Sequence, residues 1–300
     1  MSRHIVIAGA SGLIGQGLVR AATARGDRVT TLVRRPGRHS GEVEWDPAAG
    51  RLSPRALEGA DAVVLLNGAS VGRMPWTKSY REKLLNSRID STQTMVDALR
   101  ELGSAAPMLV SGSAVGYYGN APGEVLTETA GVGNTFLAKL CEAWEGAARE
   151  AETVTRVALV RTAPVIHRRG VLRPMITLTS FGLGGPLGRG SQIWPWISLE
   201  DEVRALLHVI DEGLTGPVNL CGPIPATAND IGRSLARELR RPFWLPAPQW
   251  GLKVVLGTAA TESLLTVDAD VRPGALEANG FTFTHTTAEA AVRAAVTDSS

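Results

Sequence analysis

The sequence predicts an α/β protein, with a Rossmann-type doubly wound parallel sheet followed by a smaller, mostly helical C-terminal lobe. Short apolar runs of strand length recur along residues 5–220, and segments with helical periodicity separate them. The first apolar run leads directly into a glycine-rich turn and an amphipathic segment. That order of strand, turn and helix is typical of dinucleotide-binding folds.

The chain divides into a large domain and a lobe. We expect residues 1–165 to form the Rossmann domain, and residues 197–222 to return to it. Residues 166–196 and 223–300 would then form the lobe that binds the substrate. Three hundred residues are enough for such an arrangement with a substantial core.

The composition excludes several function classes. A net charge of +2 gives no reason to expect binding to nucleic acid or to an anionic membrane. No apolar run approaches the roughly eighteen residues of a membrane span. Cys141 and Cys221 lack metal-ligand spacing, so we expect reduced thiols, no metal site and a cytoplasmic protein.

The first strand, residues 5–8, ends at a turn with three glycines. Glycines at this spacing allow a tight turn, a close approach of a pyrophosphate and close packing of the following helix on the strand. The helix start would also favour a phosphate group. The alternative is a structural turn without a ligand, since such a turn needs glycine in any case. The cofactor-binding residues expected here are Gly9, Ser11, Gly12, Leu13, Ile14 and Gly15.

The second strand, residues 28–33, ends at Arg34 and Arg35. In dinucleotide-binding folds an acidic residue at this position accepts a hydrogen bond from the ribose 2′-hydroxyl of NAD. Two arginines instead favour the 2′-phosphate of NADP, because a guanidinium presents forked donors to a phosphate. A solvated basic turn is the alternative.

Two later strands end at the same predicted edge of the sheet. Residues 62–66 lead into Asn67, Gly68 and Ala69, and a strand that we expect to end at Ser111 leads into a polar and aromatic loop. Ligands of parallel sheets lie beyond the carboxyl ends of the strands. We therefore expect these four residues to border the cofactor. Between the two strands, apolar spacing predicts a long helix over about residues 78–102.

Two helix starts are predicted in the second half of the chain. Ser198 is a suitable N-cap, and the acidic residues that follow it, among them Asp201 and Glu202, suit the first turn of a helix. A second amphipathic helix is expected to begin at Thr227.

Several motifs together resemble the short-chain dehydrogenase/reductase superfamily. They include the glycine turn, Arg34, Asn-Gly-Ala after residue 66 and Ser-Gly-Ser-Ala-Val-Gly-Tyr-Tyr-Gly at residues 111–119. The chain is similar, almost from end to end, to an atypical extended branch known as epimerase family proteins. This resemblance implies an NADP-dependent oxidoreductase or redox epimerase acting on a small carbonyl or hydroxyl compound or a sugar nucleotide. It also implies that residues 245–300 are a family-specific segment.

The chain departs from the superfamily's catalytic Ser and Tyr-x-x-x-Lys. Ser113 matches the serine, which would hydrogen-bond the reacting oxygen. The tyrosine position carries Thr135, Phe136 or Leu137, depending on register, and none has a phenol. Thr135 and Lys139 keep a hydroxyl and an ammonium four residues apart, a pair that we interpret as part of the helix surface.

Substitute groups lie nearby in the sequence. Tyr117 or Tyr118 could supply the phenol, although both could equally pack as lid aromatics. Arg88 stands on the long helix where the superfamily usually has an asparagine near the active site. It could bind an anionic group of cofactor or substrate, or be an ordinary charge on the helix surface.

Two hypotheses follow for the function. The first is an NADP-dependent enzyme, a monomer or homodimer, with an unknown small-molecule substrate. The second is an NADP-binding regulatory protein that has lost its chemistry, a class that fits the association of some relatives with cell or plastid division. The missing tyrosine favours the second, and the intact glycine turn and Ser113 favour the first.

Overall fold

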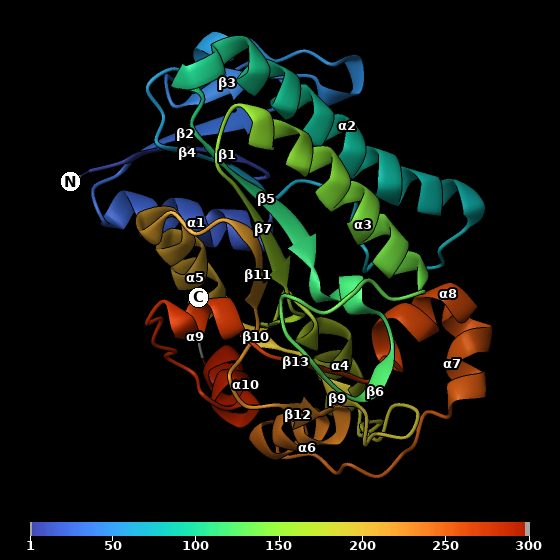
Figure 1. Ribbon diagram of the computed structural model, residues 1–300. Helices are drawn as coiled ribbons and strands as arrows, with labels where there is room; N and C mark the ends of the chain where they lie inside the picture. The colour runs from blue at the N-terminus through green and yellow to red at the C-terminus, as the bar shows by residue number, and fades with distance from the viewer. Residues whose placement is uncertain (1, 298–300) are drawn as a thin grey trace.

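Seven parallel strands form the central sheet of the protein, in the order β11-β7-β5-β4-β1-β2-β3 (Figure 1). The computed structural model describes residues 2–297, apart from the side chains of residues 251 and 254–256. The predicted α/β class with a Rossmann-type sheet is confirmed. The strands are β1 (His4–Ala8), β2 (Arg28–Val33), β3 (Glu42–Glu44), β4 (Ala62–Leu65), β5 (Met108–Ala114), β7 (Val157–Thr162) and β11 (Gly216–Leu220).

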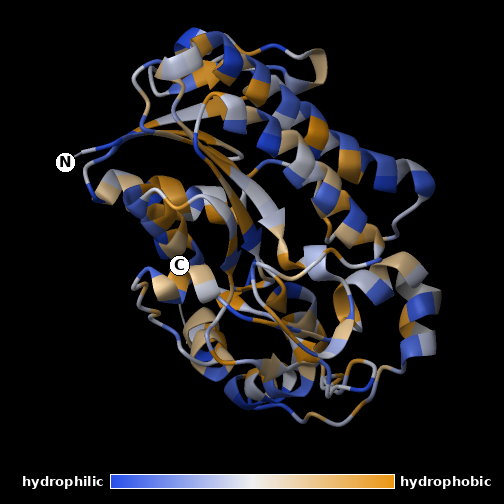
Figure 2. Cartoon of the chain, in the orientation of Figure 1, coloured by the Kyte–Doolittle hydropathy of each residue, from blue (hydrophilic) through white to orange (hydrophobic). Residues whose placement is uncertain are grey.

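Helices cover both faces of the sheet. Figure 1 shows α1 (Leu13–Ala24) and α5 (Leu199–Glu212) on one face, and α2 (Lys78–Leu102) and α3 (Phe136–Arg149) on the other. Alternate residues of β1 enter the two apolar cores, Ile5 and Ile7 on the side of α1, and Val6 and Ala8 on the side of α2. Figure 2 shows these apolar strands in the interior, with hydrophilic residues on the outer sides of α2 and α3.

The C-terminal lobe lies beyond one end of the sheet (Figure 1). Trp194 and Trp196 are buried in its core together with apolar residues of α6 (Ala228–Glu238) and α10 (Ala288–Thr297). The lobe and its connections contain β6 (Ala121–Leu126), β8 (Val165–Ile166), α4 (Leu172–Ser180), β9 (Ile193–Trp194), β10 (Ile197–Ser198), β12 (Ala226–Thr227), α6 (Ala228–Glu238), α7 (Gln249–Leu256), α8 (Thr258–Ala260), the π-helical turn η6 (Thr261–Leu265), β13 (Ala269–Val271), α9 (Gly274–Ala278) and α10 (Ala288–Thr297).

Strand β5 is longer than predicted. The expected loop after Ser111 is wrong for its first three residues, because Gly112 and Ser113 pair with Val160 and Arg161 of β7. A Cβ at Gly112 would lie 2.8 Å from the Leu65 carbonyl oxygen and 2.9 Å from the Trp144 ring. The small residue therefore lets the strand pack tightly against its neighbours, and packing overrides the loop-like local sequence. A short 3-10 helix, η4 (Val115–Tyr118), follows the strand.

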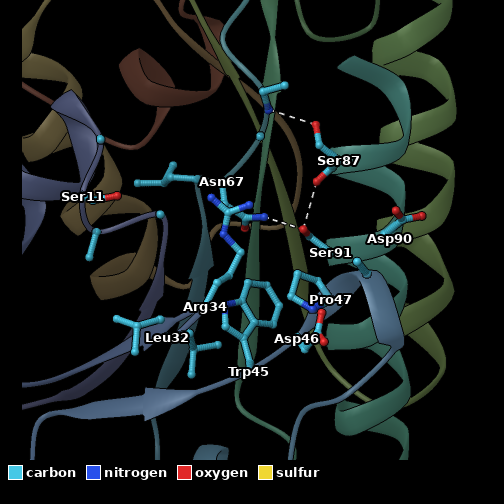
Figure 3. A pocket seen from close by; sticks show the side chains of 18 of the residues that line it. Ser11, Leu32, Arg34, Trp45, Asp46, Pro47, Asn67, Ser87, Asp90 and Ser91 are labelled. Carbon is cyan, nitrogen blue, oxygen red and sulfur yellow. Dashed lines mark hydrogen bonds between the residues drawn. The ribbon is translucent and has the colours of Figure 1, made fainter. Parts of the chain in front are cut away.

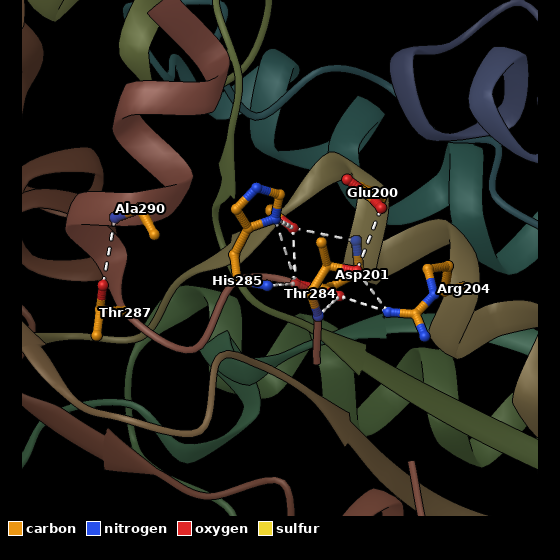
Figure 4. A network of polar contacts seen from close by, with 8 residues as sticks. Glu200, Asp201, Arg204, Thr284, His285, Thr287 and Ala290 are labelled. Carbon is orange, nitrogen blue, oxygen red and sulfur yellow. Dashed lines mark hydrogen bonds and ion pairs between the residues drawn. The ribbon is translucent and has the colours of Figure 1, made fainter. Parts of the chain in front are cut away.

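A buried polar cluster ties the end of the chain to α5 (Figure 4). As predicted, Ser198 is the N-cap, and its hydroxyl accepts a hydrogen bond from the backbone N–H of Asp201 at 3.0 Å. The fully buried Asp201 carboxylate accepts backbone N–H bonds from Thr284 at 2.7 Å and His285 at 2.9 Å. The segment that precedes α10 is thereby fixed to the start of a helix that packs on the sheet.

Three further findings concern the described part of the chain. None of its helices is long and apolar enough to cross a membrane. Within residues 2–297 no group of three or more His, Cys, Asp and Glu side chains is arranged to hold a metal ion. Cys141 and Cys221 are buried free thiols.

Candidate functional site

A cavity of about 960 Å³ lies at the carboxyl ends of β1, β2 and β4 (Figure 3). The glycine turn, the end of β2, the segment after β3 and one face of α2 form its walls. Of the residues predicted to bind a cofactor, the lining contains Gly9, Ser11, Gly12, Arg34, Arg35, Asn67, Gly68 and Ala69.

The three glycines of the turn have different surroundings. Gly9 has a φ of +86°, and a Cβ there would lie 2.7 Å from the backbone nitrogen of Asn67. A Cβ at Gly15 would lie 2.3 Å from the Gly9 carbonyl oxygen, so this glycine lets α1 pack on the turn. Gly12 faces the cavity, where a Cβ would come within 3.3 Å of the Gly9 oxygen only. Gly12 is also the N-cap of α1 and caps it with no side chain, which leaves first-turn amides for an anion.

The two predicted arginines differ in their partners. Arg35 forms a bidentate ion pair with Glu42 of β3, at 2.7 and 2.6 Å, which lowers the pKa of Glu42 to about 2. Arg34 has no hydrogen-bond or ion-pair partner among residues 2–297, and its side chain is directed into the cavity (Figure 3). Of the two arginines, Arg34 is therefore the one that remains available to a ligand.

Hydrogen bonds hold the loop after β4 against α2 (Figure 3). The Asn67 side-chain amide donates to the Ser91 hydroxyl, and the Ala69 backbone N–H donates to the Ser87 hydroxyl at 2.9 Å. Ser87 and Ser91 were missed as cavity residues in the sequence, although their spacing of four places them on one helix face. Trp45, which also lines the cavity, follows β3, and nothing in the local sequence indicates it.

Five predicted cofactor residues lie outside this lining. Leu13, Ile14 and Gly15 belong to the first turn of α1, next to the cavity. Ser111 is fully buried, and its hydroxyl donates to the Gly112 carbonyl at 3.3 Å. Arg88 lies against Gly68, where a Cβ would meet its guanidinium carbon at 3.0 Å. Its Nη1 donates to the Leu84 carbonyl, and burial lowers the Arg88 pKa.

A second polar group lies at the end of β5. The Ser113 hydroxyl donates to Glu145 at 2.7 Å, and Arg161 forms a buried bidentate ion pair with the same carboxylate, at 2.8 and 2.9 Å. Arg161 also donates to the Tyr118 hydroxyl at 2.9 Å, and that hydroxyl donates to Asn219 at 2.6 Å. Burial raises the pKa of Tyr118 to about 12. The protons of Ser113 and Tyr118 are thus both committed to protein acceptors.

Comparison with known proteins identifies the family. Residues 5–221 match the model of the NAD dependent epimerase/dehydratase family. The chain belongs to this family. The predicted resemblance to epimerase family proteins is thus confirmed, and residues 247–295 match a further family model, a domain of unknown function called DUF1731.

Individual relatives agree with this assignment. Epimerase family protein ML0860 of Mycobacterium leprae is 41% identical over 296 residues, which cover 98% of this chain and 95% of that protein. The crystal structure of human epimerase family protein SDR39U1 (isoform2) with NADPH superposes with a TM-score of 0.89 at 27% identity, over 98% of this chain and 99% of that chain. A nucleoside-diphosphate sugar epimerase from Corynebacterium glutamicum has a TM-score of 0.80 at 28% identity, over 99% of this chain but only 58% of that chain.

Within this epimerase/dehydratase family protein, Tyr117 differs from its neighbour Tyr118. The Tyr117 ring is half-buried and stacks on the Arg161 guanidinium, whose Cζ lies 3.6 Å from the ring centroid. Among residues 2–297 the Tyr117 hydroxyl has no hydrogen-bond partner, whereas the Tyr118 hydroxyl has two. Tyr117 is therefore the better placed of the two predicted phenols to meet a ligand.

The residues at the superfamily's Tyr-x-x-x-Lys position have structural roles here. Thr135 is the N-cap of α3, and its hydroxyl accepts the Ala138 backbone N–H at 3.2 Å. Lys139 is exposed on the outer side of the helix. This helix therefore offers no phenol and no paired hydroxyl and ammonium to the end of β5.

Proposed function

We propose that the protein is an NADP(H)-dependent oxidoreductase or redox epimerase of the extended short-chain dehydrogenase type. One observation carries the proposal: Arg34, a permanent cation without an acidic partner among the described residues, lines the same cavity as the glycine turn. At the end of β2 a free guanidinium suits the 2′-phosphate of NADP, and the ion-paired Arg35 holds β3 beside it. The presence of NADPH in the crystal of the human relative supports this choice of cofactor.

The cavity residues fit a dinucleotide. Gly12 faces the cavity without a side chain beside the uncapped N-terminus of α1, which suits a pyrophosphate, and Asn67 to Ala69 present a backbone edge fixed by Ser87 and Ser91. When bound, a nicotinamide cofactor supplies or accepts a hydride at carbon. The protein's own task is then to bind the substrate oxygen and to hold a proton near it.

We assign that proton to the Tyr117 hydroxyl. The Arg161 guanidinium packs against its ring and positions the phenol, and no group among residues 2–297 accepts the hydroxyl proton. Ser113 and Tyr118 would act through position, because their hydroxyls fix the Glu145–Arg161 ion pair beneath Tyr117.

The second candidate function is regulatory: the protein would bind NADP but catalyse no reaction. The commitment of the Ser113 proton to Glu145 favours it, because this serine then has no proton left for a substrate oxygen. The two candidates share the cofactor and differ in turnover.

The Arg34→Asp variant tests the cofactor assignment. We expect the parent to bind NADPH at least tenfold more tightly than NADH, a difference of about 1.4 kcal/mol. Arg34→Asp should reduce or reverse this preference, because it replaces the donor with a like charge. Arg38→Asp makes the same charge change outside the cavity lining and should keep the preference. Calorimetric titration of each protein measures both affinities, and equal parental affinities would contradict the assignment.

The Tyr117→Phe variant tests catalysis. With any substrate that turns over, it should lower kcat by about 10²–10⁴ while the NADPH affinity is unchanged, because only the positioned proton is lost. Tyr118→Phe is the control. It removes two buried hydrogen bonds, and we expect a lower melting temperature and a much smaller loss of kcat.

Equal turnover by Tyr117→Phe and the parent would show that the proton comes from elsewhere. A third result concerns the choice between the two candidates. If the parent binds NADPH but turns over none of a broad panel of carbonyl compounds and sugar nucleotides, the regulatory function is the better assignment.

A further inference from the structure

A second cavity, of about 650 Å³, lies where the start of α2, the N-terminus of α3 and residues 257–263 of the C-terminal region meet. Its walls combine two aromatic rings with a cation and hydroxyl groups. Trp76 and Phe136 pack edge to face, with ring centroids 5.6 Å apart. The family-model match that contains the glycine turn ends before residues 257–263, so this cavity is built jointly by both matched regions.

Arg81 supplies a positive charge that no acid in the lining neutralises. Its Nε is buried and has no hydrogen-bond partner in the described part of the chain, and its guanidinium carbon lies 5.9 Å from the Phe136 ring centroid. The one carboxylate among the lining residues, Glu262, is ion-paired with Lys253 at 2.7 Å. An arginine stays protonated at any physiological pH, so this corner of the cavity favours an anion.

Two hydroxyl groups of the lining have protons without an acceptor in the described part of the chain. Ser263 lines the cavity, the residue is only 6% exposed, and its buried Oγ has no partner among residues 2–297. Burying an unpaired hydroxyl is costly, so a rotation of the Ser263 side chain toward a bound acceptor would remove this cost. The Thr135 hydroxyl accepts the Ala138 N–H and still has its own proton to donate. Donors without acceptors match a carboxylate, which only accepts.

One apolar cluster connects the cavity with the group that we assign to proton transfer. Tyr117 and Ala69 pack against the same apolar cluster as Trp76 and Phe136. Trp76 and Phe136 line the second cavity, so this cluster joins its wall to the loop that follows β4 and to Tyr117.

We propose that this cavity is the substrate site and that it takes a carbonyl or hydroxyl compound with a single carboxylate on an apolar, preferably aromatic, skeleton. The carboxylate pairs with Arg81 and Ser263, and the skeleton packs between Trp76 and Phe136. A nucleotide sugar carries two phosphate charges, whereas the described lining offers one unpaired cation, so a monoanion matches it better. This inference rests on the proposed function for its chemistry, but the binding can be measured separately.

Benzoate and its neutral isostere benzamide are suitable probes. Each is titrated, without NADPH, into protein labelled with ¹⁵N in its tryptophan indoles. Trp76 lines the cavity, and its signal can be assigned among the seven tryptophans with a Trp76→Phe variant. We expect benzoate to shift the Trp76 signal and to bind at least tenfold more tightly than benzamide.

Arg81 variants then test the contact. Arg81→Ala should weaken benzoate binding at least tenfold. Arg81→Lys should weaken it less, because lysine keeps the positive charge although it lacks the paired donors of the guanidinium. Lys78→Ala removes an exposed charge from the same helix, outside the lining, and should change nothing. The inference is overturned if benzoate leaves the Trp76 signal unchanged, if benzamide binds equally well, or if Arg81→Ala binds benzoate like the parent.

The outcome is independent of the cofactor. If benzoate binds through Arg81 but NADPH does not bind, the proposed function fails while the anion site stands. If NADPH binds and the benzoate results are negative, only the substrate class fails.

Discussion

Gly12 and Gly15 lie three residues apart, but their surroundings give them different tolerance to side chains. Gly12 has extended backbone angles that any residue adopts, φ −74° and ψ 171°, and it faces the cavity. There is no room for a side chain at Gly15, because the Gly9 carbonyl oxygen lies 2.3 Å from the position of a Cβ. The turn therefore separates a residue that serves ligand binding from one that serves packing.

We expect Gly12→Val to abolish NADPH binding, because its side chain fills the approach of the pyrophosphate, with little change in melting temperature. Gly15→Ala, although smaller, should lower the melting temperature, because α1 must move away from the turn. Calorimetric titration and thermal unfolding measure the two effects. Normal NADPH binding by Gly12→Val would mean that the turn is only structural.

At the scale of elements, the packing of α5 on β7 buries a carboxyl group. The Glu202 side chain is fully buried, one oxygen accepts the Thr162 hydroxyl at 2.8 Å, and the other has no partner in the described part of the chain. Burial raises the pKa of the Glu202 carboxyl group from its ordinary value of 4.5 to about 8. The folded protein therefore holds this group protonated at neutral pH, while the unfolded chain releases the proton.

The sign of the effect on stability follows from this difference. Below pH 4.5 Glu202 is protonated in both the folded and the unfolded state, so its ionisation does not change the free energy of unfolding. As the pH rises from 4.5 toward 8, the group ionises in the unfolded chain only, and the free energy of unfolding falls. Glu202→Gln removes this loss, and we expect it to raise the free energy of unfolding at pH 7 by about 1–3 kcal/mol. Urea unfolding of parent and variant between pH 4.5 and 8 should show a gap that widens with pH. A gap of constant size would exclude titration of Glu202 as its cause.

Elements with strong local signals could be predicted from the sequence. The helix expected over about residues 78–102 is α2, Lys78–Leu102, and the caps Ser198 and Thr227 are both observed. Each depends on periodicity or on a side chain that bonds within its own turn. The prediction that β5 ends at Ser111 was wrong, because Gly112 and Ser113 are strand residues only through their contacts with β7 and Trp144.

The site was predictable to the same extent. The glycine turn, Arg34 and Asn67 lie at strand ends, and sheet topology alone brings them to one edge. Arg35 has an ion-pair partner, whereas Arg34 has none in the described part of the chain. This difference depends on Glu42, which reaches Arg35 through the pairing of β3 with β2. Arg81 and Ser263 meet at one cavity although they are 182 positions apart, and no local pattern connects them.

At the scale of the whole molecule, the two cavities differ in the matched regions that build them. The first is lined only by residues between Gly9 and Ser91, all within the epimerase/dehydratase match. The second needs residues 257–263, within the DUF1731 match. The loop after β4 contributes to both surroundings, since Ala69 lines the first cavity and packs against the apolar cluster that contains Trp76 of the second. Relatives such as the Mycobacterium leprae protein match nearly the full length, as this joint construction requires.

The contacts of Asp201 also bear on how the protein is made. Its carboxylate accepts amides that lie 83 and 84 residues further along the chain. A ribosome delivers the chain from the N-terminus, so α5 is synthesised long before those amides exist. Until then Asp201 has only its neighbours Ser198 and Arg204 as side-chain partners. The start of α5 therefore obtains these two backbone partners only after residues 284 and 285 have been synthesised.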